Sequence, residues 1–424
     1  MLDLAAAFIA LTTFFTYLNY RFIRLPPSIG VMVTALLLSL LLQGLAALGF
    51  PVLEVEAQEL IRQIDFSDVL MTWFLPALLF AGALHVNLDD LRHYRWPIGL
   101  LATAGVLLST FVVAGLAYAI VGAFGWRLDF IYCLLLGALI SPTDPIAVMG
   151  ILKTSGAPGP LQTTIVGESL FNDGTAVVVF SILLGVLTLG QTPTAGEVGL
   201  LFLEEAVGGV LFGLVLGFGV FLLMRRVDEH QPTVMLTLAL VFGGSALATH
   251  LHVSAPISMV VAGLIIGNQG RRKAMDEDAR RYVDGFWELV DEVLNALLFA
   301  LIGLELLVLP FGWLPLLAAL LLGAAVLASR FVTVASIINL LRRLRGGDRR
   351  TGPGAVRLLT WGGLRGGVSL ALALSLPLGE QRDLVLTLTY LVVLMSILLQ
   401  GLTVGRVVCA LYGRRAEPAT DEMH

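Results

Sequence analysis

The sequence predicts an all-α protein that crosses a membrane many times, and three observations support this prediction. Of the 424 residues, 57% are hydrophobic and only 13% are charged, whereas soluble domains carry about 25% charged residues. The mean hydropathy is +0.90. Apolar stretches of about 20 residues, the length that crosses a hydrocarbon core of ~30 Å, recur along the whole chain. This composition excludes a soluble enzyme, and it excludes intrinsic disorder, which requires a low apolar content.

The charge and the cysteines exclude other classes of protein. The formal net charge is −5, whereas a nucleic-acid-binding protein normally has a basic face. The two cysteines, Cys133 and Cys409, both lie inside apolar runs. They provide neither a disulfide framework nor a CxxC metal site. We therefore expect no nucleic-acid partner and no cofactor.

The apolar stretches predict about thirteen membrane spans. In chain order they cover residues 4–22, 29–48, 69–86, 97–124, 130–152, 161–189, 198–224, 233–250, 256–267, 293–309, 313–341, 355–376 and 384–412. The ninth is short, and twelve spans would result if the eighth and ninth formed one broken unit. Residues 52–66 and 268–292 are polar insertions with apolar positions at helical spacing, which predicts amphipathic helices on the membrane surface.

The basic residues predict the orientation of the spans. If the amino terminus lies outside, the connections that face the cytoplasm hold 19 of the 26 Lys and Arg residues, and the outward connections hold 3. This asymmetry follows the positive-inside rule and places the carboxyl terminus and residues 268–292 on the cytoplasmic side. We expect a multi-pass protein of the inner cell membrane with its amino terminus outside.

The fifth span contains the run Ser141-Pro142-Thr143-Asp144-Pro145. A charged group at membrane depth costs several kcal/mol, so Asp144 is a candidate for function. The two prolines remove backbone hydrogen bonds, which predicts an interrupted helix surrounded by protein or by a watery cavity. The structural alternative is a proline kink with a capping Thr143–Asp144 pair.

The sixth span carries Glu168, Ser169, Asn172 and Asp173. A spacing of four places Ser169 with Asp173 on one helix face, and Glu168 with Asn172 on the adjacent face. Hard oxygen ligands that converge near the membrane midplane suit a small desolvated cation or a proton. The alternative is a buried packing network without transport.

Arg330 is the single charge of the eleventh span. A guanidinium cannot lose its charge, so inside a membrane it needs a buried carboxylate partner. We expect Glu168 to be that partner, because Asp173 must remain free to exchange its ligand. The alternative is an arginine that extends to the membrane surface, which the depth of Arg330 in its span disfavours.

The twelfth span carries Arg365 within the glycine-rich run at 361–367. Paired glycines permit unwinding or a close helix crossing, so this span and the fifth form a matched pair of interrupted helices. Such a pair in opposite halves is typical of inverted-repeat transporters with a site at the midplane. In a crossing, Asp144 would neutralise the positive helix ends and Arg365 the negative ones.

Two other features have weaker implications. Gly209, Gly213 and Gly217 form a stripe of small residues on the seventh span, which predicts close helix packing. Glu305 lies near the outer end of the tenth span. Its place is equally consistent with the membrane interface and with a functional site.

The polar segments resemble those of the monovalent cation:proton antiporter family, specifically its sodium/proton exchanger branch of prokaryotic and plant type. The resemblance is carried by SPTDPIAV at 141–148, GESLFNDGTAVVVF at 167–180, Arg330, and WGGLRGGVSLALALSLP at 361–377. Together with the number and order of the spans, it covers essentially the whole transmembrane chain. The combination of the TDP and ND motifs at this spacing is the most specific part of the match.

The resemblance implies a set of ion-binding residues. They are Asp173, Asn172, Ser169, Thr143 and Asp144, of which Asp173, Ser169 and Thr143 would ligate Na⁺. It also implies a structural salt bridge between Glu168 and Arg330. Family members with asparagine at the position of Asn172 resemble electroneutral exchangers, which move one cation for one proton.

The resemblance further implies a homodimer whose subunits each have two parts. Spans 1–3 and 7–10, at residues 1–96 and 198–309, would form a dimerisation scaffold. Spans 4–6 and 11–13, at residues 97–197 and 310–412, would form a moving core that holds two crossed, unwound helices. Residues 413–424 would form a short cytoplasmic tail.

We therefore expect a secondary active transporter, not an enzyme, that exchanges Na⁺ (or Li⁺) for H⁺ by elevator-type alternating access and serves pH homeostasis. Since Asp173 would bind either a proton or a cation, competition couples the two fluxes. K⁺/H⁺ exchange is the alternative, because the sequence does not fix the radius of the site. An intramembrane aspartyl protease using Asp144 and Asp173 would lack the Tyr-Asp and Gly-x-Gly-Asp motifs of its class, and a channel would need filter-like loops.

Overall fold

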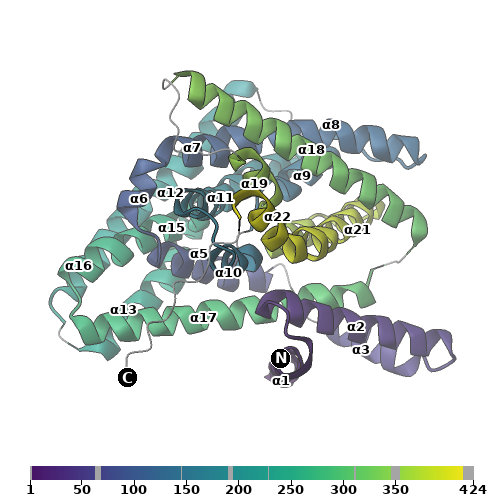
Figure 1. Ribbon diagram of the computed structural model, residues 1–424, viewed down its shortest axis with the longest axis horizontal. Coiled ribbons are helices and arrows are strands. Elements are labelled where there is room, and N and C mark those ends of the chain that lie inside the picture. Colours follow the sequence, from purple (N-terminus) through teal and green to yellow (C-terminus); the bar gives the residue numbers. More distant parts are fainter. Residues whose placement is uncertain are drawn as a thin grey trace.

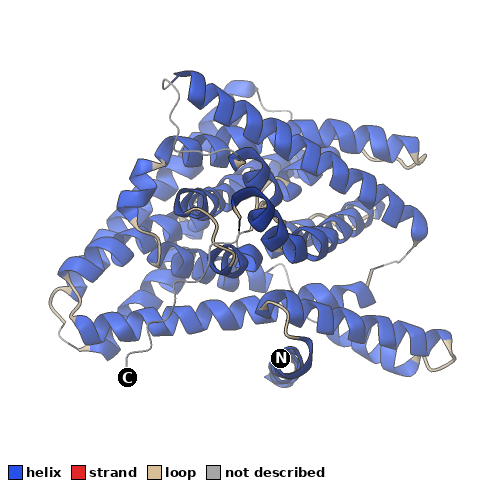
Figure 2. Cartoon of the chain, viewed as in Figure 1, coloured by secondary structure: helices blue, strands red, loops and turns tan. Residues whose placement is uncertain are grey.

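The computed structural model describes residues 2–62, 68–144, 146–189, 194–227, 229–309, 312–344 and 354–413. Within these residues the chain is helical, and its only β-type pairing is one isolated bridge (Figure 2). Seven helices of this described part of the chain are long and apolar enough to cross a membrane. The predicted all-α membrane fold is therefore confirmed. The basic residues at 345–350 and the tail at 414–424 lie outside the described residues.

Each predicted span falls on a helix or on a pair of helices. The first six fall on α1 (Leu2–Leu18), α2 (Pro27–Ala47), α5 (Leu75–Leu84), α7 (Arg95–Leu100) with α8 (Val106–Ala123), α9 (Phe130–Ile140) with α10 (Ile146–Thr154), and α11 (Gly159–Leu189). The others fall on α12 (Ala195–Met224), α13 (His230–Leu238) with α14 (Gly244–His250), α15 (Ala255–Ile265), α17 (Glu277–Leu304), α18 (Trp313–Leu344), α19 (Ala355–Trp361) with α20 (Gly367–Leu374), and α21 (Glu380–Met395) with α22 (Leu402–Tyr412).

Short elements complete the described chain. Three short helices connect longer ones: α3 (Val52–Arg62), α6 (Leu88–His93) and α16 (Arg271–Lys273). α3 begins where the sequence predicts an amphipathic helix at 52–66, of which residues 63–67 lie outside the described ranges. Several spans contain a wide π-helical turn, including Leu101–Gly105, Ala239–Gly243 and Ser396–Gly401. Such turns disturb the regular backbone hydrogen bonding without ending the helix.

The segment after the ninth span differs from the expectation. The sequence predicts a separate surface helix at 268–292, but α17 runs unbroken from Glu277 to Leu304. Since no proline lies in this segment, nothing in the backbone separates its amphipathic part from its apolar part. The amphipathic part also packs inward, because Val283 and Trp287 are fully buried and Trp287 Nε1 donates to Thr237 Oγ1 over 2.9 Å. The prediction of a separate surface helix is wrong.

The eighth and ninth stretches are separate helices that pack against each other, α14 against α15. α15 is short, and every residue from Pro256 to Ile265 is buried. It packs between α5 and α12, so its environment is protein on several sides.

The glycine stripe on α12 faces α15, as predicted. A Cβ atom on Gly213 would lie 2.5 Å from the Ser258 carbonyl oxygen, and a Cβ atom on Gly217 would lie 2.9 Å from Ile265 Cδ1. Only glycine allows the two helices to approach so closely. The stripe is therefore a packing surface.

Many of the contacts between helices fall into two sets, and these sets also touch where α17 packs against α20. In one set α8 contacts α9 and α18, and α21 contacts α18 and α20. In the other, α15 contacts α5 and α12, and α17 contacts α2 and α5. Figure 1 shows α2 and α17 along one edge, α8 and α18 along the opposite edge, and α10, α19 and α22 between them. α11 contacts members of both sets, among them α9, α12 and α15.

Candidate ion-binding site

Two pairs of helices, α9 with α10 and α19 with α20, are each interrupted at the centre of the fold. The stretches between them run antiparallel where the Asp144 backbone N–H donates to the Leu364 carbonyl over 2.8 Å. Pro142 cannot donate a backbone hydrogen bond, and Gly362 and Gly363 weaken the helix, so both helices break at the predicted motifs. The crossing of two interrupted helices is confirmed.

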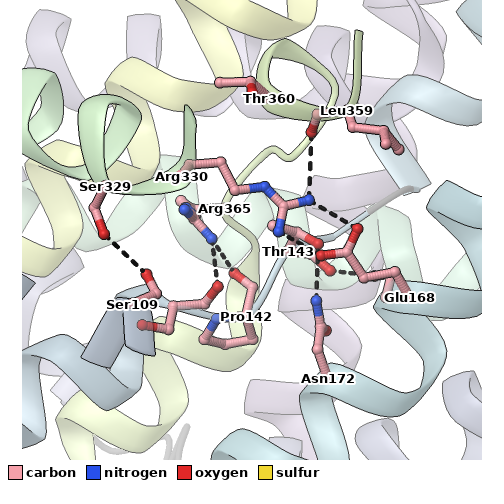
Figure 3. A network of polar contacts seen from close by, with 12 residues as sticks. Ser109, Pro142, Thr143, Glu168, Asn172, Ser329, Arg330, Leu359, Thr360 and Arg365 are labelled. Atoms are coloured by element: carbon pink, nitrogen blue, oxygen red, sulfur yellow. Dashed lines mark hydrogen bonds and ion pairs between the residues drawn. The ribbon is translucent and has the colours of Figure 1, made fainter. Parts of the chain in front are cut away.

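Charged side chains lie at two of the broken helix ends of this crossing. Arg365 donates through Nη1 to the carbonyls of Ser141 and Pro142, over 2.6 and 2.8 Å, at the carboxyl end of α9 (Figure 3). The Asp144 side chain lies against Gly366, the residue before α20, where a Cβ atom would come within 2.2 Å of Asp144 Oδ2. A helix has partial negative charge at its carboxyl end and partial positive charge at its amino end. Each side chain therefore offsets the charge of the helix end beside it.

Glu168 on α11 and Arg330 on α18 form a buried ion pair (Figure 3). Arg330 Nη2 donates to Glu168 Oε2 over 2.8 Å, and Arg330 Nη1 donates to Glu168 Oε1. Only 1% of Glu168 and 6% of Arg330 is exposed. Arg330 Nη2 also donates to the Leu359 carbonyl on α19 over 3.3 Å. A fixed positive charge thus holds both oxygens of this carboxylate, and the pair connects α11 with α18 and α19.

Thr143 joins the interrupted stretch to α11 through two contacts. The Ser169 hydroxyl donates to the Thr143 carbonyl, and Asn172 Nδ2 donates to Thr143 Oγ1 over 2.9 Å. Asn172 is fully buried, and its Oδ1 atom has no hydrogen-bond partner among the described residues. Buried carbonyl oxygens without a donor are uncommon in folded proteins. The Asn172 oxygen and the lone pairs of the Ser169 hydroxyl are therefore acceptors that a bound cation can use.

Asp173 follows Asn172 on α11, but it is only half-buried. Among the described residues, no donor makes a hydrogen bond with its carboxylate, and the Asp144 carboxylate is close enough to repel it. The next residue, Gly174, packs against α15, where its Cβ would lie 2.6 Å from Ile257 Cγ1. The open carboxylate thus lies where α11 passes from the crossing to α15.

The predicted site residues lie around Thr143. Ser169 and Asn172 each contact Thr143, and Glu168, Arg330, Asp144, Arg365 and Asp173 lie around these three. Glu305 lies apart from this cluster. It is buried in the turn at the end of α17. It interacts electrostatically with two other titratable residues, Arg382 and Tyr390.

Two features at or near the site do not follow from the sequence. The backbone carbonyls of Ser141, Pro142 and Leu359 accept hydrogen bonds from the two arginines. Asp291 lies in the segment for which the sequence predicts a surface helix, yet it is half-buried and close enough to Asp144 for the two carboxylates to repel each other. A usable signal was present, because Asp291 precedes a second polar residue, Asn295, by one helical turn.

The oxygen atoms of the candidate ion-binding cluster carry little negative charge. Within the described ranges, no group of three or more His, Cys, Asp or Glu side chains converges to hold a metal ion. The cluster instead combines the Asp173 carboxylate, beside Asp144, with neutral oxygens of Asn172, Ser169 and Thr143. Hard oxygen donors with this little negative charge suit a small monovalent cation better than a multivalent one.

Comparisons with known proteins agree with this architecture. Residues 9–410 match the family described as sodium/hydrogen exchanger, transmembrane. The chain is 69% identical over 424 residues to the Na(+)/H(+) antiporter NhaP of Pseudomonas aeruginosa, covering 100% of both chains. It is 35% identical over 391 residues to the Na(+)/H(+) antiporter NhaH of Halobacillus dabanensis, covering 90% of this chain and 91% of that one. Its fold is similar to that of the sodium proton antiporter MjNhaP1 from Methanocaldococcus jannaschii, with a TM-score of 0.74, 17% sequence identity, and coverage of 96% of this chain and 97% of that one.

Proposed function

The chain belongs to the sodium/hydrogen exchanger family and is a membrane transporter, not an enzyme, and we propose that it exchanges one Na⁺ or Li⁺ for one proton at Asp173. Its relatives at 69% and 35% identity carry the name Na(+)/H(+) antiporter. This supports antiport of the same two ions by this chain. Membership of a transporter family excludes an intramembrane aspartyl protease with Asp144 and Asp173 as its dyad.

The open carboxylate of Asp173 carries the proposal. Both Glu168 oxygens are bound by Arg330, and the Asp144 side chain lies at the amino end of α20. The Asp173 carboxylate accepts no hydrogen bond from the described residues, whereas Arg330 donates to both oxygens of Glu168. A carboxylate that transports must release its ligand in each cycle, and a fixed donor would compete with that ligand.

The neighbouring oxygens would complete the coordination of a cation at Asp173. The Asn172 Oδ1 atom is buried without a partner. The Ser169 hydroxyl gives its hydrogen to Thr143, so its oxygen lone pairs can turn to the ion. Proton and cation compete for the same carboxylate, and this competition couples the two fluxes without separate machinery.

The proposed ratio of one cation to one proton follows from the groups that can titrate. Asn172 is neutral at every accessible pH. Glu168 is held by Arg330, whose charge is permanent. Asp173 is then the single exchanging group of the cluster, and a cycle that carries one charge in each direction transfers no net charge.

We assign the movement to the core of spans 4–6 and 11–13, which would slide as an elevator against a scaffold of spans 1–3 and 7–10. The two packing sets of the fold support this division. Two glycines lie where the sets meet: Gly174 of α11 packs on Ile257 of α15, and Gly367 of α20 packs on Leu298 of α17. A glycine presents a flat surface without a side chain, which favours sliding over interlocking.

The proposed setting is a homodimer in the inner cell membrane, formed through the scaffold, with each amino terminus outside. The excess of Lys and Arg on alternate connections supports this orientation. In that orientation α11 enters the membrane from the cytoplasm at Gly159. Exchange of Na⁺ for H⁺ there would serve pH homeostasis.

Proteoliposomes that contain a pH-sensitive dye test the proposal. We expect Na⁺ and Li⁺, added in turn, to drive proton movement through the purified protein, and Asp173→Asn to abolish it because an amide cannot hold an exchangeable proton. Asp383→Asn is the matched control, since Asp383 is exposed in the first turn of α21 and, among the described residues, forms an ion pair with Arg382 over 3.4 Å. Appreciable cation-driven proton flux through Asp173→Asn contradicts the assignment. An equal response to K⁺ would replace Na⁺ selectivity with K⁺/H⁺ exchange on the same scaffold.

A further inference from the structure

α17 carries two polar side chains that the exchange site does not use, Asp291 and Asn295. They are four residues apart, so they lie on one face of the helix. Leu298 continues this face by another turn and contacts the crossing, because a Cβ atom on Gly367 would lie 2.4 Å from Leu298 Cδ1. The face that carries Asp291 and Asn295 therefore points toward the amino end of α20, where the Asp144 side chain lies.

The burial of the Asn295 side chain is unusual, because its amide oxygen has no hydrogen-bond partner among the described residues. Asn295 is 3% exposed, and its Oδ1 atom makes no hydrogen bond in the part of the chain that the structure describes. Asp291 is half-buried, and the Asn295 side chain lies beside its carboxylate. A buried amide oxygen that faces no donor is expected to have a ligand or ordered water. The two oxygens form the beginning of a coordination shell.

The charges around Asp291 are all negative. Asp144 faces it from the crossing, and Glu288 and Glu292 lie near it on α17 itself. No Lys or Arg within the described ranges forms an ion pair with Asp291; the basic residues of this region, Arg271 and Arg280, pair with Asp284 instead. A half-buried carboxylate among carboxylates attracts a mobile cation, because no fixed cation is present to balance it.

α17 is fixed in the set of helices that we assign to the scaffold. Trp287, one turn before Asp291, is fully buried. Its ring packs at a tilt against Phe80 of α5, with ring centroids 4.8 Å apart, and its Nε1 donates to Thr237 of α13. A cation held at Asp291 would therefore stay with the scaffold while the core moves. It would lie on the side of Asp144 that is nearer to Glu277, the end of α17 that we place in the cytoplasm.

We propose that Asp291 and Asn295 form a second site for a monovalent alkali cation, which collects Na⁺ or Li⁺ from the cytoplasm and delivers it to the crossing. This site rests on the proposed exchange at Asp173, but it does not need exchange to bind its ion. Its ligands are the Asp291 carboxylate and the Asn295 carbonyl oxygen, with water in the remaining positions. Its effect is to raise the local concentration of the cation beside Asp173.

A binding measurement in a transport-inactive background separates this site from the first. Thermal unfolding of the purified Asp173→Asn protein is measured with NaCl or LiCl against choline chloride at equal ionic strength. A ligand that binds the folded state raises Tm, so we expect Na⁺ to stabilise Asp173→Asn. The double variant Asp173→Asn/Asp291→Asn should lose this stabilisation, and Asp173→Asn/Glu292→Gln should keep it. Glu292 is the matched control because it carries the same charge on the adjacent position of α17 and is exposed.

Transport kinetics provide an independent test of the second cation site. Asp291→Asn alone should raise the KM for Na⁺ roughly tenfold through the lost local attraction. Its kcat at saturating Na⁺ should stay within about twofold of the parent, as expected for a group that contributes to binding only. Asn295→Ala should also raise KM, and Asn295→Asp, which keeps an oxygen in place, should restore it. If Asp291→Asn does not purify in a folded state, the Asn295 variants decide the question by the same two measurements.

Two results would overturn the second site. One is that Na⁺ fails to stabilise Asp173→Asn, or that it stabilises the Asp291 double variant equally. The other is that Glu292→Gln raises KM as much as Asp291→Asn, which would show a general effect of charge. A failure of the first proposal has a different signature, namely exchange that persists in Asp173→Asn.

Discussion

Glu168 and Asp173 are two carboxylates five residues apart on the same helix, and their surroundings are opposite. Glu168 is 1% exposed, and Arg330 binds both of its oxygens. Asp173 is half-buried, and its carboxylate has no hydrogen bond from the described residues. Both groups are carboxylates at a similar depth in the membrane, so neither property explains why they behave differently. A fixed countercharge makes one carboxylate structural, and the lack of one leaves the other free to exchange.

The two arginines of the crossing extend this comparison. Arg330 is balanced by a full carboxylate charge, whereas Arg365 donates to two backbone carbonyls at the end of α9. Arg365 is anchored further by its backbone N–H, which donates to Ser396 Oγ over 3.1 Å. Because Arg365 takes carbonyls as partners, it leaves the carboxylates of the crossing to other roles.

The largest expected effect is the loss of stability when the Glu168–Arg330 pair is broken. Arg330→Ala should lower the free energy of unfolding by about 3–5 kcal/mol, because it leaves a buried carboxylate without its partner. Asp173→Asn should melt at or above the temperature of the parent protein, since it removes a charge that Asp144 repels. Thermal unfolding in detergent measures both. If the two variants had equal Tm values, the contrast between the carboxylates would be wrong.

An arginine on the same helix serves as the control for this measurement. Arg343 is exposed in the last turn of α18, so Arg343→Ala should change stability little. An Arg330→Ala protein that melts with the parent and with Arg343→Ala would show that the buried pair does not stabilise the fold.

A smaller effect is expected where Asp144 meets α20. Gly366→Ala would place a Cβ atom 2.2 Å from Asp144 Oδ2, so the crossing must shift. We expect a loss of about 1–3 kcal/mol of stability together with a lower exchange rate. Gly219→Ala is the control, because a Cβ atom there meets nothing within 4 Å. Parent-like transport by Gly366→Ala would show that the Asp144 contact with α20 is dispensable.

The smallest expected effect is that of a membrane potential on proton movement, which should be zero if Asp173 exchanges its ligand and Glu168 does not. With equal Na⁺ and equal pH on both sides of proteoliposomes, a membrane potential set by K⁺ and valinomycin should produce no pH change. The reason is that Asp173 exchanges one charge for one charge while Arg330 keeps both oxygens of Glu168 bound. A potential-driven proton flux that disappears in Asp173→Asn would mean that a second group titrates, and Asp144 or Glu168 would be examined first.

The sequence by itself determined the membrane fold and the places where helices break. Membrane spans follow from composition, because about 20 apolar residues must cover the hydrocarbon core wherever the segment lies. The breaks follow from local chemistry, since Pro142 lacks an N–H and the glycines around Arg365 weaken the helix. The candidate site residues follow from the free-energy cost of placing a charged group inside a membrane, because such groups are rare there unless they have a function.

The tertiary structure alone decided the geometry in which these groups meet, although elimination among the buried carboxylates predicts Glu168 as the partner of Arg330. Arg330 needed a carboxylate, but Glu168 is 162 residues away in the chain, and no local spacing encodes a contact over that distance. The same holds for the antiparallel contact of Asp144 with Leu364. Asp291 shows the limit most clearly. Its sequence context is that of an amphipathic surface segment, and only the packing of α17 against α20 turns that face toward the crossing. Hydropathy and propensity act along the chain, whereas charge pairing depends on which helix faces the packed fold brings together.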